Sequence, residues 1–259
     1  MHFVLFVSLA SAGLFVGMLV AQQVGRWIGV RHAAKDPEHS HTGISAVDGA
    51  LFGLLGLLVA FTFSGAATRF DTRRNLIVDE ANAIGTAYRR LDLLPAEARP
   101  HLQQLFRQYL DSRLEVYAKL PDLEAARSAL ARSAGLQDEI WAHAVAAVRM
   151  EGALPAAPFL VMPALNQMID ITTTRTMATQ VHPPTLIYAM LFAMALASGL
   201  LAGFDMARHK WPSWLHMLGF AAVMAAAVFV ILDLEYPRLG LVRTDNFDQL
   251  LVDLRASMG

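Results

Sequence analysis

Between residues 48 and 73 the sequence carries an apolar stretch bounded by charged residues, a pattern that could conduct ions. At 100° per residue, one helix face presents aromatic, aliphatic and hydroxyl side chains between one acidic and two basic residues. Hydrophobic constrictions with charged mouths occur in channels that gate by dewetting. Simple helix packing with an interfacial aspartate explains the same residues, so both interpretations stay open. The lining candidates are Phe52, Leu55, Val59 and Thr62, and the pore-mouth charges are Asp48, Arg69 and Arg73.

The opposite face of the same segment is a ridge of small residues. Small side chains at this spacing let another helix approach closely in a membrane. A similar spacing recurs later in the chain, at Gly199 and Gly203. We therefore expect helix packing along both segments. The first ridge consists of Gly49, Gly53, Gly56, Ala60, Ser64 and Ala67.

Other kinds of chemistry lack the residues that they need. The chain has no cysteine, which excludes disulfides, thiolate zinc sites and a cysteine nucleophile. No phosphate loop, dinucleotide fingerprint, nucleophile elbow or zinc-protease motif is present. The 21 basic and 22 acidic residues nearly balance, without the basic excess that nucleic-acid binding requires. We expect no enzyme, no cofactor, no resident metal and no nucleic-acid partner.

Four windows free of Asp, Glu, Lys and Arg are long enough to cross a bilayer, which takes about 20 helical residues. No basic residue precedes the apolar run of the first window, so this window is a retained helix rather than a cleaved signal. With 55% hydrophobic residues, the chain is predicted to be a multi-pass protein of the inner membrane. The windows are 1–25, 49–68, 176–204 and 211–232.

The region between the second and third windows reads as helical. No proline occurs between residues 49 and 94, which predicts one helix from about residue 46 to Pro95, about 70 Å long at 1.5 Å per residue. Its outer half keeps an apolar stripe that includes Ile77 and Ile84, and later segments can cover it. Asp122 can cap one of those segments. The predicted fold is all-α, with helix pairs in 1–68 and 185–259 and an extramembrane helical domain in 69–184.

The charge around the first window predicts an orientation. Arg26, Arg31 and Lys35 follow it, and basic residues favour the cytoplasmic side. This asymmetry places the amino terminus outside, and with it the central domain. Arginines near the other membrane ends, among them Arg73 and Arg175, reduce the difference in basic charge between the two sides of the membrane.

Five segments resemble the bestrophin-like domain family, a broad group of mostly bacterial four-helix membrane proteins of unknown function. Together they extend over nearly the whole chain, and the run EANAIG is the most specific of them. The family is distantly similar to the bestrophins, which are pentameric anion channels. The segments are GLLGLLVAFTFS at 53–64, RFDTRR at 69–74, EANAIGTAY at 80–88, ALNQMID at 164–170 and DLEYPRLGLVR at 233–243.

The resemblance implies a bestrophin-like, homo-oligomeric channel, with a pentamer by analogy and chloride or other small anions as the conducted ions. In bestrophins the second span lines a hydrophobic neck, and the helices after it build a vestibule. The acidic calcium cluster of animal bestrophins has no counterpart here, so calcium gating is not implied. Bestrophins also keep the vestibule and both termini in the cytoplasm, opposite to the charge argument. The alternative function is a non-conducting membrane protein whose helical domain binds a partner or senses envelope conditions.

Overall fold

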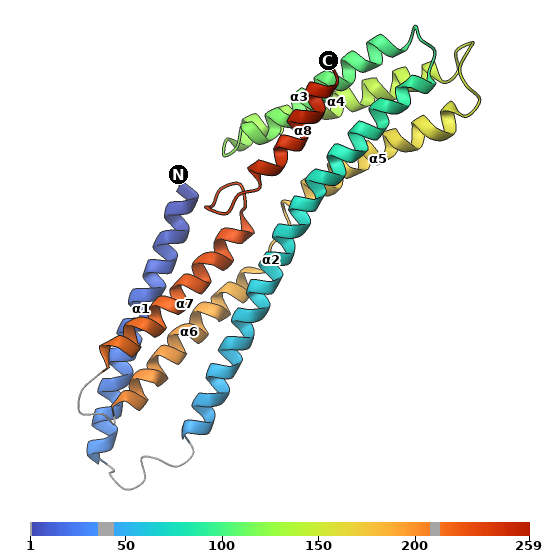
Figure 1. Ribbon diagram of the computed structural model, residues 1–259. Coiled ribbons are helices and arrows are strands. Elements are labelled where there is room, and N and C mark those ends of the chain that lie inside the picture. The colour runs from blue at the N-terminus through green and yellow to red at the C-terminus, as the bar shows by residue number, and fades with distance from the viewer. Residues whose placement is uncertain (1, 36–43, 208–212) are drawn as a thin grey trace. The chain divides into compact units, whose positions relative to one another are not determined.

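The computed structural model describes residues 2–35, 44–207 and 213–259, and these residues form helices joined by short loops (Figure 1). The described part of the chain contains no strand, which confirms the all-α prediction. The elements are α1 (His2–Lys35), α2 (Ile44–Arg90), a 3-10 turn η1 (Leu91–Leu93), α3 (Arg99–Ala118), α4 (Leu123–Ala147), α5 (Ala157–Ala178), α6 (Thr185–Met206), α7 (Trp214–Glu235) and α8 (Asp245–Ser257).

Four of these helices, α1, α2, α6 and α7, are long and apolar enough to cross a membrane. They overlap the four windows found in the sequence, with the third helix beginning at Thr185 rather than at residue 176, so the chain is a multi-pass membrane protein. The predicted long helix is also confirmed, because α2 runs for 47 residues without a break. It ends in η1, just before Pro95 removes a backbone donor.

The chain divides into two compact units. The membrane unit comprises Met1–Phe70 and His182–Val242, and the helical unit comprises Asp71–Val181 and Arg243–Gly259. The boundaries differ from the predicted ones at the carboxyl end, since α8 belongs to the helical unit rather than to the second helix pair. The reason is packing: Leu251 of α8 is buried in the core of the helical unit.

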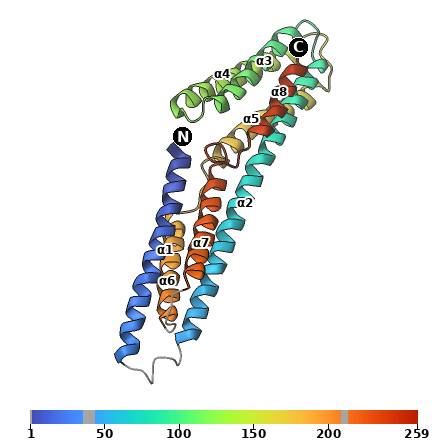
Figure 2. The same cartoon turned by 60° about the vertical axis from the view of Figure 1, so that its left-hand side comes forward.

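In the membrane unit, α1 packs against both α6 and α7 (Figures 1 and 2). Glycines bring α1 and α6 into close contact. A Cβ atom on Gly203 would overlap the backbone of Gln22, and one on Gly25 would overlap the backbone of Leu200. Small residues therefore set the distance between these two helices, as is usual in membranes.

The helical unit has its own core, built from α3, α4, α5, α8 and the outer half of α2. The apolar stripe of α2 is covered as predicted, and Ile77 and Ile84 are both buried. Asp122 caps α4 by accepting hydrogen bonds from the amides of Glu124 and Ala125, each at 3.1 Å. This cap is also confirmed.

Candidate functional site

The face of α2 predicted to line an ion path is turned toward the chain's own helices. Leu55 is 3% exposed and belongs to the core of the membrane unit. The ring of Phe52 meets that of Phe220 on α7 edge to face, with centroids 5.9 Å apart. Val59 packs against the same core, and the Thr62 hydroxyl donates to the Leu58 carbonyl of its own helix at 2.8 Å. Phe52, Leu55 and Val59 thus contact the core of their own subunit, and the lining of an ion path by this face stays a prediction.

The other face of α2 is exposed along the span. A Cβ atom on Gly49, Gly53 or Gly56 would meet nothing within 4 Å in the described chain. Beside these glycines stand large apolar side chains, with Phe61 67% exposed and Leu57 50% exposed. On the exposed surface of α2, the ridge of small residues therefore lies beside a stripe of large apolar side chains.

The three glycines of α2 and the two glycines of α6 differ in their surroundings. A Cβ on Gly199 would lie 3.3 Å from the Met18 carbonyl oxygen, and one on Gly203 would overlap Gln22. Those glycines have a helix of the same chain against them. The glycines of the α2 ridge have no helix against them in the described chain.

Of the predicted pore-mouth charges, Asp48 is buried and Arg69 forms an ion pair. Arg69 Nε donates to Glu235 Oε1 at 2.9 Å, and His182 Nδ1 lies 3.4 Å from Glu235 Oε2. The ring of His182 stacks on Tyr236, with centroids 4.5 Å apart. Glu235, at the end of the last span, thus pairs with an arginine near the end of the second span.

Arg73 has a different role, within the helical unit. Its side chain is buried and donates to the Ala178 carbonyl at 3.0 Å and to the Val181 carbonyl at 2.8 Å. Ala178 is the last residue of α5, where the helix dipole favours a cation, and Val181 follows three residues later. Arg73 therefore holds the end of α5, and its place at a pore mouth stays a prediction.

The segment that follows α7 is organised around Asp233. This buried carboxylate accepts hydrogen bonds from the backbone amides of Leu241 and Val242, both at 2.8 Å. A Cβ atom on Gly240 would overlap the same carboxylate, so the close approach requires glycine. The motif DLEYPRLGLVR is thus a folded loop closed on its own aspartate.

The helical unit contains a buried cluster of charges that the sequence did not reveal. Glu80 on α2 pairs with Arg113 on α3, whose Nε lies 2.5 Å from Oε1, and with Arg175 on α5. Arg175 also donates to Asp248 on α8 at 3.1 Å. Its guanidinium lies over the ring of Tyr117, 3.9 Å from the centroid. The Glu80 carboxylate joins α2, α3 and α5, and Asp248 connects α8 to them through Arg175.

A neutral network lies beside this cluster. The hydroxyl groups of Tyr109 and Thr172 are 2.9 Å apart, and Gln137 Nε2 donates to both at 3.0 Å. Burial, with the negative charge of Glu80, raises the pKa of Tyr109 to about 12. Burial alone would lower the pKa of Arg113, but Tyr117 and Glu80 hold it above its ordinary value. These groups keep fixed protonation states, as structural residues do.

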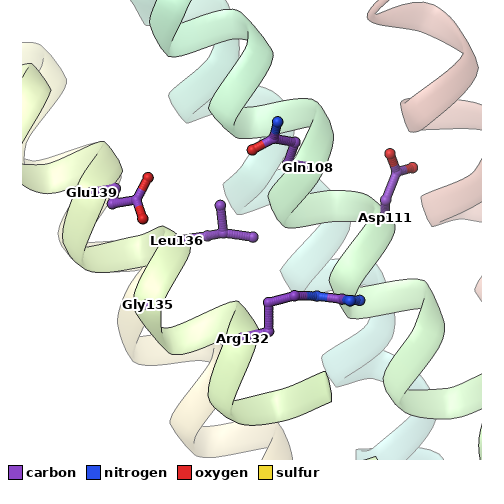
Figure 3. A pocket seen from close by; sticks show the side chains of 6 residues that line it. All are labelled: Gln108, Asp111, Arg132, Gly135, Leu136 and Glu139. Carbon is purple, nitrogen blue, oxygen red and sulfur yellow. The ribbon is translucent and has the colours of Figure 1, made fainter. Parts of the chain in front are cut away.

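A shallow hollow lies on the surface of the helical unit between α3 and α4 (Figure 3). Its polar side chains come from both helices, and Asp111 at its rim accepts a hydrogen bond from Arg255 at 2.8 Å. Across residues 2–35, 44–207 and 213–259, no three His, Asp or Glu side chains are grouped closely enough to hold a metal. The hollow is lined by Gln108, Asp111, Arg132, Gly135, Leu136 and Glu139.

Solved structures share this fold. A point variant of a bacterial bestrophin homologue from Klebsiella pneumoniae has a TM-score of 0.68 and 14% identity, covering 93% of this chain and 97% of that chain. A second variant of that homologue has a TM-score of 0.67 and 15% identity, covering 94% and 98%. A structure described as a membrane protein has a TM-score of 0.65 and 15% identity, covering 93% and 98%. At such identities the likeness shows the fold alone.

Sequence comparison extends this likeness to the family. No curated protein matches the chain. A family model described as the bestrophin-like domain matches residues 8–245, which is most of the sequence. The chain therefore belongs to the bestrophin-like family.

Proposed function

We propose that this chain is one subunit of a homo-oligomeric anion channel in the inner membrane, with its ion path along α2. The observation that carries the proposal is the exposed face of α2, where small and apolar residues have no partner helix in the described chain. The interior of the membrane unit is filled by side chains such as Leu55 and Met18. An ion path therefore requires several copies, arranged around a common axis.

The exposed face suggests which residues line that path. In a ring of identical subunits, the middle of the exposed face points to the axis and its flanks contact the neighbours. Gly53, Leu57 and Phe61 follow each other at four-residue steps across the middle of this face. The ridge residues Gly49 and Gly56 lie on one flank, where a neighbouring helix can approach closely. We place the hydrophobic constriction at Leu57 and Phe61.

Anions are the proposed ions because of the resemblance to bestrophin anion channels, and chloride is the first ion to test. The apolar part of the exposed face carries no carboxylate, since Asp48 is turned inward and buried. Cation channels commonly place rings of acidic side chains along the path. Such a ring is not formed by the apolar span of α2.

Chloride flux from liposomes that contain the purified chain tests this proposal. Phe61→Ala shortens a side chain at the constriction and lowers the dewetting barrier, so flux should rise about tenfold, or about 1.4 kcal/mol in the barrier. Thr62→Ala, on the inward face of the same helix, is the matched control and should leave flux nearly unchanged. Flux at the level of empty liposomes, or crosslinking that returns only monomers, would rule out the channel.

A second function has one observation in its favour. Apolar side chains are exposed near the start of α5, where Phe159 is 79% exposed and Leu154 is 51% exposed. Exposed apolar patches often mark contacts with a protein partner. If no flux is found, we propose instead that the helical unit of a non-conducting membrane protein binds a partner there. Stoichiometric crosslinking to a second protein that Phe159→Ser abolishes would support this function.

The orientation can be tested independently because the chain has no cysteine. We propose, from the basic residues after the first span, that the amino terminus and the helical unit lie outside. A single cysteine placed at the exposed position Glu97 should then react with a membrane-impermeant maleimide in intact spheroplasts. Labelling only after lysis would place the helical unit in the cytoplasm, as in bestrophins.

A further inference from the structure

The helices α3 and α4 form an antiparallel pair whose seam is marked by polar contacts (Figures 1 and 2). Near the turn that connects the two helices, Arg132 pairs with Glu115, and the hydroxyls of Ser112 and Ser133 are 2.7 Å apart. At the other end of the seam, His101 of α3 meets His143 of α4. Each helix thus contributes one imidazole to the open end of the hairpin.

The two imidazoles are close and accessible. Their Nε2 atoms are 3.2 Å apart, the ring centroids are 4.4 Å apart, and the ring planes meet at 77°. Both side chains are exposed, so water and solutes reach the two nitrogens. Neither histidine belongs to the core of the helical unit or to the charge cluster around Glu80.

The spacing of these nitrogens suits a shared metal ion. Imidazole nitrogens bind Zn²⁺ at about 2.0–2.1 Å, so two nitrogens on one ion lie about 2.9–3.4 Å apart for angles between 90° and 110°. The observed 3.2 Å falls inside this interval. Both side chains are exposed, so their rings can rotate to direct the two lone pairs at one ion. Imidazole is a preferred ligand of zinc, copper and nickel.

We propose that His101 and His143 form a two-histidine binding site for a divalent transition metal such as Ni²⁺, Cu²⁺ or Zn²⁺. Among the described residues no third His, Asp or Glu joins the pair, so water completes the coordination and the site stays open to exchange. The bound ion links residue 101 to residue 143 and closes the free end of the α3–α4 hairpin. Because the metal binds the folded state and not the unfolded state, its binding stabilises the helical unit. The site does not depend on whether the protein conducts ions.

Isothermal titration of the full chain with NiCl₂ tests the site. The protein is purified in detergent without a polyhistidine tag, because the tag would bind the metal. Removal of either ligand, by His101→Ala or by His143→Ala, should weaken the binding at least about tenfold. His216→Ala removes an exposed histidine that contacts Ser213 instead, and this control should bind as the wild type does. An excess of CaCl₂ should not compete, since calcium prefers oxygen ligands.

Thermal melting gives a second readout. Nickel should raise the melting temperature of the wild type and of the His216→Ala variant, but not that of the two ligand variants. Equal melting temperatures without metal would show that all variants fold. Nickel binding of the same affinity in the double variant His101→Ala, His143→Ala and in the wild type would overturn the proposal. Absence of binding in the wild type would overturn it as well, and would leave the pair a simple hydrogen bond.

Discussion

Replacing Glu80 by alanine is expected to lower the free energy of unfolding of the helical unit by about 3–5 kcal/mol. Glu80 is fully buried and pairs with Arg113, which is also fully buried, and with Arg175, which is 4% exposed. Without the Glu80 carboxylate, the guanidinium groups of Arg113 and Arg175 remain buried in the unit. Arg175 keeps its ion pair with Asp248. An uncompensated buried charge costs far more than the loss of an exposed ion pair. Urea denaturation in detergent, followed by circular dichroism, measures the change.

Two further variants separate charge from packing. Glu139→Ala removes an exposed carboxylate from α4 and should change the free energy of unfolding by less than about 0.5 kcal/mol. The double variant Glu80→Leu, Arg113→Met replaces one buried pair by apolar groups and should recover part of the lost stability. If Glu80→Ala were no worse than Glu139→Ala, the cluster would not be a stabilising feature of this unit.

The sequence predicted the elements of this fold well because their signals are local. Apolar length alone located α1, α6 and α7, and the absence of proline after residue 49 predicted the long α2. The cap at Asp122 involves only the backbone amides of the two residues Glu124 and Ala125, which follow closely in the sequence. The charge cluster is different, since Glu80, Arg113, Arg175 and Asp248 come from four helices whose contacts are not local. One signal was present: Glu80 falls on the apolar stripe of α2, between Ile77 and Ile84, where a charge must be paired.

The face of α2 that lines the proposed path could not be predicted from the sequence. Both faces of its span are apolar or small, and hydrophobicity does not distinguish a lipid-facing surface from a helix contact or a dry constriction. The choice of Leu55 and Val59 favoured the face with the larger side chains next to Asp48. In the structure that face packs inward, and Asp48 is buried with it. The position of α7, through contacts such as Phe52 with Phe220, decides which face remains exposed.

Gly203→Ala is expected to lower the free energy of unfolding of the membrane unit by about 1–3 kcal/mol, and Gly203→Leu by more. An added Cβ would overlap the backbone of Gln22, and a backbone cannot move aside as a flexible side chain can. The helices α1 and α6 would have to separate along their whole contact, with loss of the close packing that holds membrane helices together. Unfolding in mixed micelles with increasing sodium dodecyl sulfate, followed by circular dichroism, measures this loss.

Gly13→Ala is the matched control for Gly203→Ala, because a Cβ on Gly13 of α1 would meet nothing within 4 Å. Alanine has the higher helix propensity, so the control should be neutral or slightly stabilising. Gly56→Ala adds a contrast, since its added Cβ also meets nothing within the described chain. It should leave the folding of the subunit intact and weaken its assembly, because the proposed partner of that face is another copy. Equal stability of Gly203→Ala and Gly13→Ala would contradict the close α1–α6 contact. Unchanged assembly of Gly56→Ala would argue against an oligomer contact at Gly56.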